Sequence, residues 1–212
     1  MEKPLRLALI GMSGAGKTFW SKKLAAQGCA MVSCDDRIGE RLKSHLAAGG
    51  YEGINGVAAW MGWPDSGSYS EREALYLAEE IHVLDETLSS LEHDRERPLI
   101  LDTTGSVIYV GNNLLYRLRK LMTVVYLAAS ETDRQLLIER YLNDPKPVLW
   151  RGAFVAKPAE KPRDTVTRCY PGLIEARRRG YEALAHVTIP VRELRDPSMN
   201  ANRFLALARK GS

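Results

Sequence analysis

One stretch near the start of the chain places glycine, lysine and threonine at a spacing that suits phosphate chemistry. Residues 11–18 read GMSGAGKT, which fits the pattern Gly-x-x-x-x-Gly-Lys-Thr. The fixed places of the pattern are taken by Gly11, Gly16, Lys17 and Thr18. An apolar run at 5–10 predicts a buried strand before the stretch, and the sequence at 17–27 predicts a helix after it. A turn that merely joins strand to helix is the alternative, but the residues and their context together favour a phosphate-binding loop.

A loop in this position turns backbone N–H groups toward one point at the positive end of a helix dipole. Lys17 can then reach the β- and γ-phosphates of a nucleotide, and the Thr18 hydroxyl can help to hold Mg²⁺. We therefore expect ATP and Mg²⁺ as cofactors. The residues expected to bind the nucleotide are Gly11, Ser13, Gly14, Ala15, Gly16, Lys17 and Thr18.

Carboxylates follow two further predicted strands. Asp102 ends the apolar run at 97–102, where a carboxylate would hold Mg²⁺ through water together with Thr18. Asp35 and Asp36 follow the apolar run at 29–34. Either of these could orient a hydroxyl or take its proton, and one of the pair could instead cap the next helix.

An alternation of strand and helix patterns would position these side chains. Strands are predicted at 5–10, 29–34, 97–102, 122–128 and 186–191, and helices at 17–27, 35–48, 70–91, 111–121, 131–142, 170–185 and 200–210. Ser70 and Glu73 have the spacing of a capping box, and Ser130 is the expected cap of the helix at 131–142. Strands separated by helices imply a parallel sheet with helices on both faces, and ligands then bind at the carboxyl ends of the strands.

Two long segments interrupt the alternation. Residues 49–68 hold six glycines and two tryptophans, which predicts irregular backbone; a surface excursion without a substrate role and an acceptor-binding segment both fit. Residues 143–164 hold four prolines together with Trp150 and Phe154. Because large aromatic side chains are unusual in a solvated linker, the second segment is predicted to be a lid.

Composition indicates the class of protein. The 212 residues, 45% of them hydrophobic, are enough for one α/β domain. Three cysteines without metal-ligand spacing favour a reducing compartment, and no stretch approaches a membrane span or a signal-peptide core, so a cytoplasmic protein is expected. A monomer is also expected. Residues 146–168 carry six basic and two acidic side chains. The sequence has no basic stripe interleaved with aromatics, so nucleic-acid binding is not expected.

The sequence resembles the shikimate kinases and the related gluconate kinases. LALIGMSGAGKTFWSKKLAAQGCAMVSCDDRIGERL is similar to the family's opening, and TVVYLAASETDRQLLIERYLNDPKPVLW to its fourth strand, next helix and the start of its lid. The family's Arg-x-x-x-Tyr-x-x-x-Ala pattern is matched by Arg177, Tyr181 and Ala185. The resemblance implies a P-loop NTPase three-layer sandwich with five parallel strands in the order 2-3-1-4-5. It implies one kinase domain over 1–212, with an acceptor-binding insert at about 36–92 and a lid at about 144–168.

The resemblance also implies roles for single residues. Asp35 would contact the hydroxyls of the acceptor, in preference to Asp36, and Arg72 and Arg177 would grip its carboxylate. One arginine of the lid region would stabilise the transferring phosphoryl group; Arg140 is favoured, and Arg151 and Arg163 are the other candidates.

The sequence departs from the family at the turn after the third strand. The family's glycine-rich turn is replaced by DTTGS at 102–106, so Thr103, Thr104 and Gly105 are expected to line the floor of the acceptor pocket. Thr103 and Thr104 are expected to present hydroxyls there. Ser33 also stands where the family usually has an aspartate. Shikimate is therefore the first acceptor to test rather than a secured one.

Three classes of function fit these observations. The first is an ATP-dependent kinase of a small, anionic, hydroxylated metabolite. The second is a nucleoside or nucleotide kinase in which Trp60 and Trp63 stack on a base. The third is a non-catalytic nucleotide-binding module, which would need neither the acceptor carboxylate at Asp35 nor a basic lid.

Overall fold

The computed structural model describes residues 4–209 and contains one five-stranded sheet. All four neighbouring pairs are parallel, and the order is β2-β3-β1-β4-β5, which confirms the predicted order. The strands are β1 (Arg6–Ile10), β2 (Ala30–Ser33), β3 (Leu99–Asp102), β4 (Thr123–Ala128) and β5 (Val187–Pro190).

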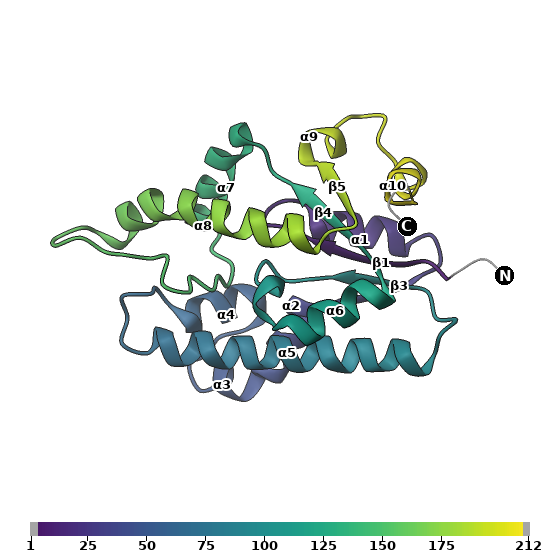
Figure 1. The fold of residues 1–212 in the computed structure, drawn as a ribbon. Coiled ribbons are helices and arrows are strands. Elements are labelled where there is room, and N and C mark those ends of the chain that lie inside the picture. Colours follow the sequence, from purple (N-terminus) through teal and green to yellow (C-terminus); the bar gives the residue numbers. More distant parts are fainter. Residues whose placement is uncertain (1–3, 210–212) are drawn as a thin grey trace.

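Helices connect the strands and cover the sheet (Figure 1). They are α1 (Lys17–Ala25), α2 (Cys34–Arg41), α3 (Lys43–Ala47), α4 (Gly53–Met61), α5 (Tyr69–His93), the 3₁₀ helix η1 (Val107–Tyr109), α6 (Asn112–Leu121), α7 (Glu131–Asn143), α8 (Pro162–Leu184), α9 (Val191–Leu194) and α10 (Ala201–Ala208). Within the described part of the chain, no helix is long and apolar enough to cross a membrane.

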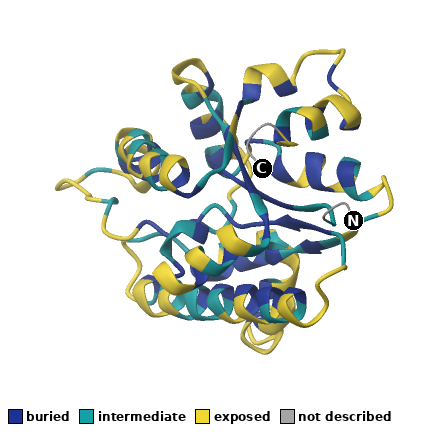
Figure 2. Cartoon of the chain, turned by 45° about the vertical axis from the view of Figure 1, so that its right-hand side comes forward, coloured by how far each residue is buried: buried dark blue, intermediate teal, exposed yellow. Residues whose placement is uncertain are grey.

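The sheet separates two hydrophobic cores. Successive β1 side chains alternate between them, as strand geometry requires: Leu7 and Leu9 join the core under α1, α9 and α10, while Ala8 and Ile10 join the larger core under the other long helices. Figure 2 shows the three inner strands β3, β1 and β4 as mainly buried and the outer helix faces as exposed. Both faces of the inner strands are thus covered, which explains their continuous apolar sequences.

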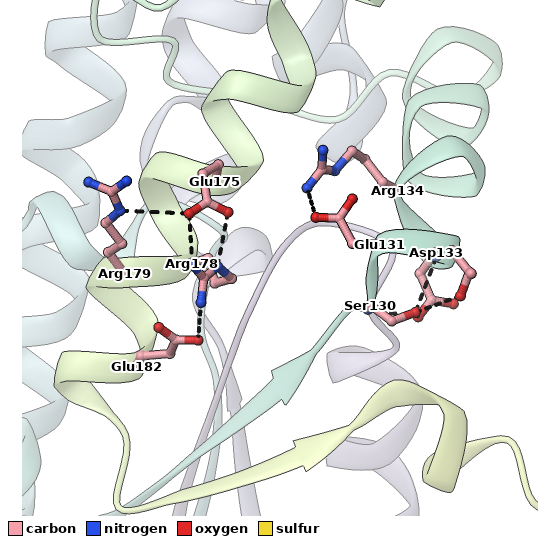
Figure 3. Close-up of polar contacts among 9 residues, drawn as sticks. Ser130, Glu131, Asp133, Arg134, Glu175, Arg178, Arg179 and Glu182 are labelled. Atoms are coloured by element: carbon pink, nitrogen blue, oxygen red, sulfur yellow. Dashed lines mark hydrogen bonds and ion pairs between the residues drawn. The ribbon is translucent and has the colours of Figure 1, made fainter.

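The helix beginnings differ in part from the predictions. Ser130 caps α7 as predicted, in a capping box with Asp133 (Figure 3). The capping box predicted for Ser70 is wrong, because α5 begins one residue earlier and Ser68 precedes it without a side-chain cap. The cap of α2 is Ser33, whose hydroxyl accepts from the Asp36 N–H at 3.2 Å, so neither aspartate caps this helix.

The two long segments contain more helix than predicted. Residues 53–61 form α4 inside the segment expected to be irregular, because Val57, Trp60 and Met61 give it a buried face. The helix predicted at 35–48 is divided at Leu42 into α2 and α3. The last helix was expected to reach residue 210, which lies outside the described residues.

The segment predicted to be a lid leaves the body of the molecule as a long loop. Residues 144–161 form no helix or strand, and α8 then begins at Pro162, which stands in the first turn where its missing N–H costs no hydrogen bond. In Figure 1 this green loop extends past the start of α8.

Candidate active site

The phosphate-binding loop joins β1 to α1 and has the backbone that its glycines allow. Gly11, Gly14 and Gly16 have φ values of 141°, 82° and 96°, which side-chain-bearing residues rarely adopt. A Cβ atom on Gly11 would stand 2.8 Å from the carbonyl oxygen of Leu127. The Ala15 N–H donates to the Met12 carbonyl at 3.2 Å, which closes the turn. Because the first N–H groups of α1 have no acceptor within the helix, the loop fits an anion at this point.

Lys17 lies buried under this loop, with 7% of its surface exposed. Its Nζ donates to the carbonyls of Gly11 at 3.0 Å and Met12 at 3.2 Å. Burial lowers the pKa of the ammonium, and the nearby carboxylates of Asp102 and Asp35 oppose this shift. The structure therefore brings the predicted lysine and both predicted carboxylates into one electrostatic cluster.

Asp102 ends β3, opposite Leu9 of β1 and Ser33 of β2 in the register. It is buried, and its Oδ1 has no hydrogen-bond partner among residues 4–209. Burial raises the pKa of this carboxyl group, while the charge of Lys17 and a hydrogen bond from Thr18 act in the opposite direction. A carboxylate oxygen without a partner beside a hydroxyl fits Mg²⁺, which takes few protein ligands and keeps waters and phosphates as the others.

The two neighbouring aspartates have different surroundings. Asp35 is half-buried in the first turn of α2, and its Oδ1 accepts from the Tyr76 hydroxyl of α5 at 3.0 Å. Burial raises the pKa of Asp35, against the effects of Lys17 and Tyr76. Asp36 is exposed. Of the two, Asp35, the residue favoured from the sequence, is the one whose charge acts on Lys17.

The hydroxyls of the turn after β3 point into the scaffold. The Thr103 hydroxyl donates to the Leu9 carbonyl at 2.8 Å, and the hydroxyls of Thr104 and Ser106 donate to the two carboxylate oxygens of Glu80, Ser106 at 2.6 Å. Thr103 and Thr104 are 1% and 2% exposed. The expectation that they present hydroxyls to the pocket is wrong, because buried hydroxyls need acceptors and these are supplied by β1 and α5.

Glu80 was missed from the sequence. It is 2% exposed on α5, and burial raises its pKa to about 7, against the hydrogen bonds from Ser106 and Thr104. One signal was present: Tyr76, Glu80 and Leu84 recur at four-residue spacing, which places the acid in the apolar stripe of the helix.

Of the two arginines expected to grip a carboxylate, Arg177 lies in the cluster. It is 1% exposed, and its Nη1 and Nη2 donate to the carbonyls of Gly105 at 2.8 Å and Leu149 at 2.6 Å. Its Nε has no partner in the part of the chain that the structure describes. A Cβ atom on Gly105 would stand 3.1 Å from Arg177 Nη1, so glycine allows this close approach.

The other arginines nearby have different roles. Arg178 and Arg179, the neighbours of Arg177 on α8, pair with surface glutamates of the same helix (Figure 3). Arg72 donates to the Trp60 carbonyl and lies over the Trp60 ring, 5.4 Å from its centroid. Arg72 is therefore engaged with α4.

Among the lid-region arginines, Arg140 contacts the phosphate-binding loop. Its Nη1 donates to the Gly14 carbonyl at 2.7 Å. A cavity of 440 Å³ lies beside this contact, with Ser13, Gly14 and Arg140 in its wall. Arg151 and Arg163 are exposed, and the Arg151 N–H donates to Glu73 at 3.1 Å.

Comparisons with known proteins place the fold. No protein-family model matches the sequence, and no curated protein sequence matches it. Shikimate kinase from Acinetobacter baumannii, solved in complex with shikimate, superposes with a TM-score of 0.60 at 24% identity over 98% of this chain and 91% of that one. Shikimate kinase from Bacteroides thetaiotaomicron superposes with a TM-score of 0.57 at 18% identity, over 98% of this chain and 93% of that one. Shikimate kinase from Aquifex aeolicus superposes with a TM-score of 0.53 at 15% identity, over 97% of this chain and 92% of that one. The chain has the shikimate kinase-like fold.

Proposed function

We propose that this chain is an ATP-dependent kinase that transfers the γ-phosphoryl group to a hydroxyl of a small, anionic metabolite. One observation carries the proposal: a buried lysine of a phosphate-binding loop shares one sheet edge with two carboxylates, Asp102 and Asp35. A site that only binds nucleotide needs a metal-side carboxylate, and the second carboxylate provides for an acceptor.

The residues divide the work of the reaction. The loop and Lys17 bind the phosphates, and Thr18 and Asp102 would hold Mg²⁺, which when bound neutralises phosphate charge. Asp35 orients the acceptor hydroxyl and accepts its proton as phosphoryl transfer proceeds. Arg177 has an unused Nε–H for a carboxylate, whereas Arg72 would have to leave the Trp60 carbonyl to join it.

The same proposal covers the organisation of the chain. One kinase domain carries an acceptor-binding insert at about 36–92 and a lid at about 144–168, and it acts as a cytoplasmic monomer. Arg140, already against Gly14, is the arginine best placed to stabilise charge on the transferring group.

A screen of acceptors tests the proposal. ADP release is measured with Mg·ATP and shikimate, gluconate, other sugar acids or nucleosides, in the wild type, Lys17→Ala and Lys120→Ala. Lys120 is exposed on α6 and serves as the control. Stimulation by an acid that is abolished in Lys17→Ala and kept in Lys120→Ala is expected. Nucleotide affinity and turnover unchanged in Lys17→Ala would contradict it.

A nucleoside kinase is the second candidate, favoured by one cavity. Trp63 and Tyr141 line a cavity of 240 Å³ between α4 and the start of the lid, large enough for a base. Trp60, the other proposed stacking residue, is buried beneath Arg72. Stimulation by a nucleoside but by no acid in the same screen would select this candidate.

A further inference from the structure

Helix α5 contacts the walls of the candidate acceptor site at points one helical turn apart. Tyr76 donates to Asp35, and Glu80, four residues later, accepts from Thr104 and Ser106. Residues at i and i+4 lie on one face of a helix, so a single face of α5 is bonded both to the acceptor carboxylate and to the turn after β3.

The turn in question holds Arg177 in place. Gly105 stands between the two hydroxyl donors, and its carbonyl accepts from Arg177 Nη1 at 2.8 Å and from the Tyr181 hydroxyl. The Ser106 N–H donates to the Thr104 hydroxyl oxygen at 3.1 Å, which fixes the turn internally. The conformation of Gly105 therefore depends on the hydroxyls of Thr104 and Ser106 on either side of it. Both of these hydroxyls are held by hydrogen bonds to the Glu80 carboxylate.

We propose that Glu80 is a positioning residue of the acceptor site, which holds the turn 103–106, and through it the Arg177 guanidinium, in the binding conformation. In this chain, hydrogen bonds to Glu80 would hold the turn that the glycine-rich turn of the family forms with its backbone alone. This role rests on the proposed function in one respect, because the acceptor site belongs to that function.

The chemistry of the carboxylate supports the role. As an anion, Glu80 can accept from both hydroxyls, one on each oxygen. When it is protonated, one oxygen becomes a donor, and one hydroxyl loses its acceptor. The hydroxyl oxygens of Thr104 and Ser106 are 3.0 Å apart, so that hydroxyl rotates toward the other one, since a buried polar group without a partner is costly. The hydrogen bonds that hold the turn should thus rearrange when Glu80 takes up a proton.

The surroundings of Glu80 bring its protonation close to neutral pH. Burial raises the pKa of Glu80 to about 7; Asp35 of α2 acts in the same direction, and Arg177 of α8 in the opposite one. Cys34 of α2 and Tyr76 of α5 also face the carboxylate, and burial raises the pKa of each so far that both stay neutral. Glu80 is thus the group in this cluster whose pKa burial raises to about 7.

Amide NMR of the full chain tests the inference without any acceptor. In the wild type, the amide signals of Gly105 and Ser106 should shift with a midpoint near pH 7. Glu80→Gln should abolish this titration. Ser106→Ala, which removes a hydrogen bond that lowers the Glu80 pKa, should leave a titration on Gly105 with a higher midpoint. Glu71→Gln, on an exposed position of the same helix, is the matched control.

A kinetic arm uses shikimate at saturating Mg·ATP. Glu80→Gln should raise KM for shikimate at least tenfold, while the affinity for Mg·AMP-PNP stays within about twofold of wild type. The rate in the wild type should fall below pH 7, and that dependence should be absent from the variant. Kinetics of Glu71→Gln should match the wild type.

The outcomes separate the inference from the proposed function. Gly105 and Ser106 signals that titrate identically in wild type and Glu80→Gln would overturn the role of Glu80. If the wild type does not phosphorylate shikimate, only the choice of shikimate as acceptor is contradicted. The NMR titration, which needs no acceptor, then decides whether Glu80 holds the turn. A Glu80→Gln variant that is folded, keeps KM and keeps the wild-type pH profile would also overturn it.

Discussion

At the scale of single residues, the surroundings of Asp35 and Asp36 assign them different work. Asp35 is fixed by Tyr76 and lies in the field of Lys17, whereas Asp36 is exposed. Asp35→Asn should lower turnover about 100-fold or more, as for loss of a general base, and leave Mg·AMP-PNP affinity within about twofold. Asp36→Asn is the control and should keep turnover. Equal losses of turnover and nucleotide affinity in Asp35→Asn would indicate that Asp35 acts on the bound metal and not on the acceptor.

The placement of a residue could be predicted from the sequence where local position determines it. Asp35 and Asp102 stand just past or at a strand end, Lys17 and Thr18 begin the helix after the phosphate-binding loop, and parallel strands bring such positions to one edge. The direction of the Thr103 and Thr104 hydroxyls could not be predicted in this way. Their acceptors come from β1 and from α5, and no local pattern specifies a partner so far away in the sequence.

At the scale of elements, the segment predicted to be a lid is anchored at its start, and farther along its Val155 carbonyl accepts from Arg168 of α8 at 2.6 Å. The Tyr69 hydroxyl of α5 donates to the Val148 carbonyl at 2.7 Å and accepts from the Trp150 N–H at 3.1 Å, and Trp150 is 1% exposed. Residues 155–159 are exposed. Of the two aromatics that favoured a lid, Trp150 is buried in the core, and the Phe154 ring packs edge-on against it with centroids 5.2 Å apart.

The anchored start makes closure a testable property of 151–161. Limited proteolysis should cut this loop in the free protein, and Mg·AMP-PNP with an acceptor should slow cleavage at least fivefold, because closing loops become protected when ligands order them. Cleavage within α5 serves as the internal reference. Equal rates of loop cleavage in both conditions would leave the segment as a connection.

The arginines of this region should differ in effect. Arg140→Ala should lower kcat about 10²-fold with little change in AMP-PNP affinity, since a donor to the transferring group acts mainly in the transition state. Arg163→Ala, at an exposed position in the first turn of α8, is the matched variant and should be near wild type. Unchanged turnover in both Arg140→Ala and Arg151→Ala would show that neither arginine stabilises the transferring phosphoryl group.

Elements were predicted best where periodicity and length agreed. The five strands and α5 to α7 were predicted to within a few residues. Helix α4 was missed because the glycines at 53 and 56 hide its periodicity, and its stability comes from packing of Trp60 and Met61 in the core. Propensity was overridden there by tertiary contact.

At the scale of the whole molecule, the nucleotide loop depends on the smaller of the two cores. Helix α1, which begins at Lys17, packs on α10 through Trp20, whose ring stacks on Phe204 with centroids 5.0 Å apart. Phe204 is 0% exposed and Trp20 is 3% exposed. The end of the chain therefore supports the helix that carries the loop.

Replacing Phe204 tests this dependence. Phe204→Ala should cost about 3–5 kcal/mol of unfolding free energy, since it removes a buried ring and leaves a cavity. For a chain of this size that lowers Tm by roughly 6–20 °C, measured by calorimetry. Tyr116→Ala removes a ring that is 65% exposed and should change stability by about 0.5 kcal/mol or less.

Nucleotide binding should restore part of the lost stability. A ligand that binds only the folded state adds ~2.7 kcal/mol at a hundred times its Kd, so Mg·AMP-PNP should raise the Tm of Phe204→Ala and of the wild type alike. Because the loop conformation is fixed by its own glycines and by β4, the affinity of the folded variant should stay within about threefold of wild type. A variant that keeps its Tm but loses nucleotide affinity would mean that α10 acts on the loop directly instead of through the stability of the core.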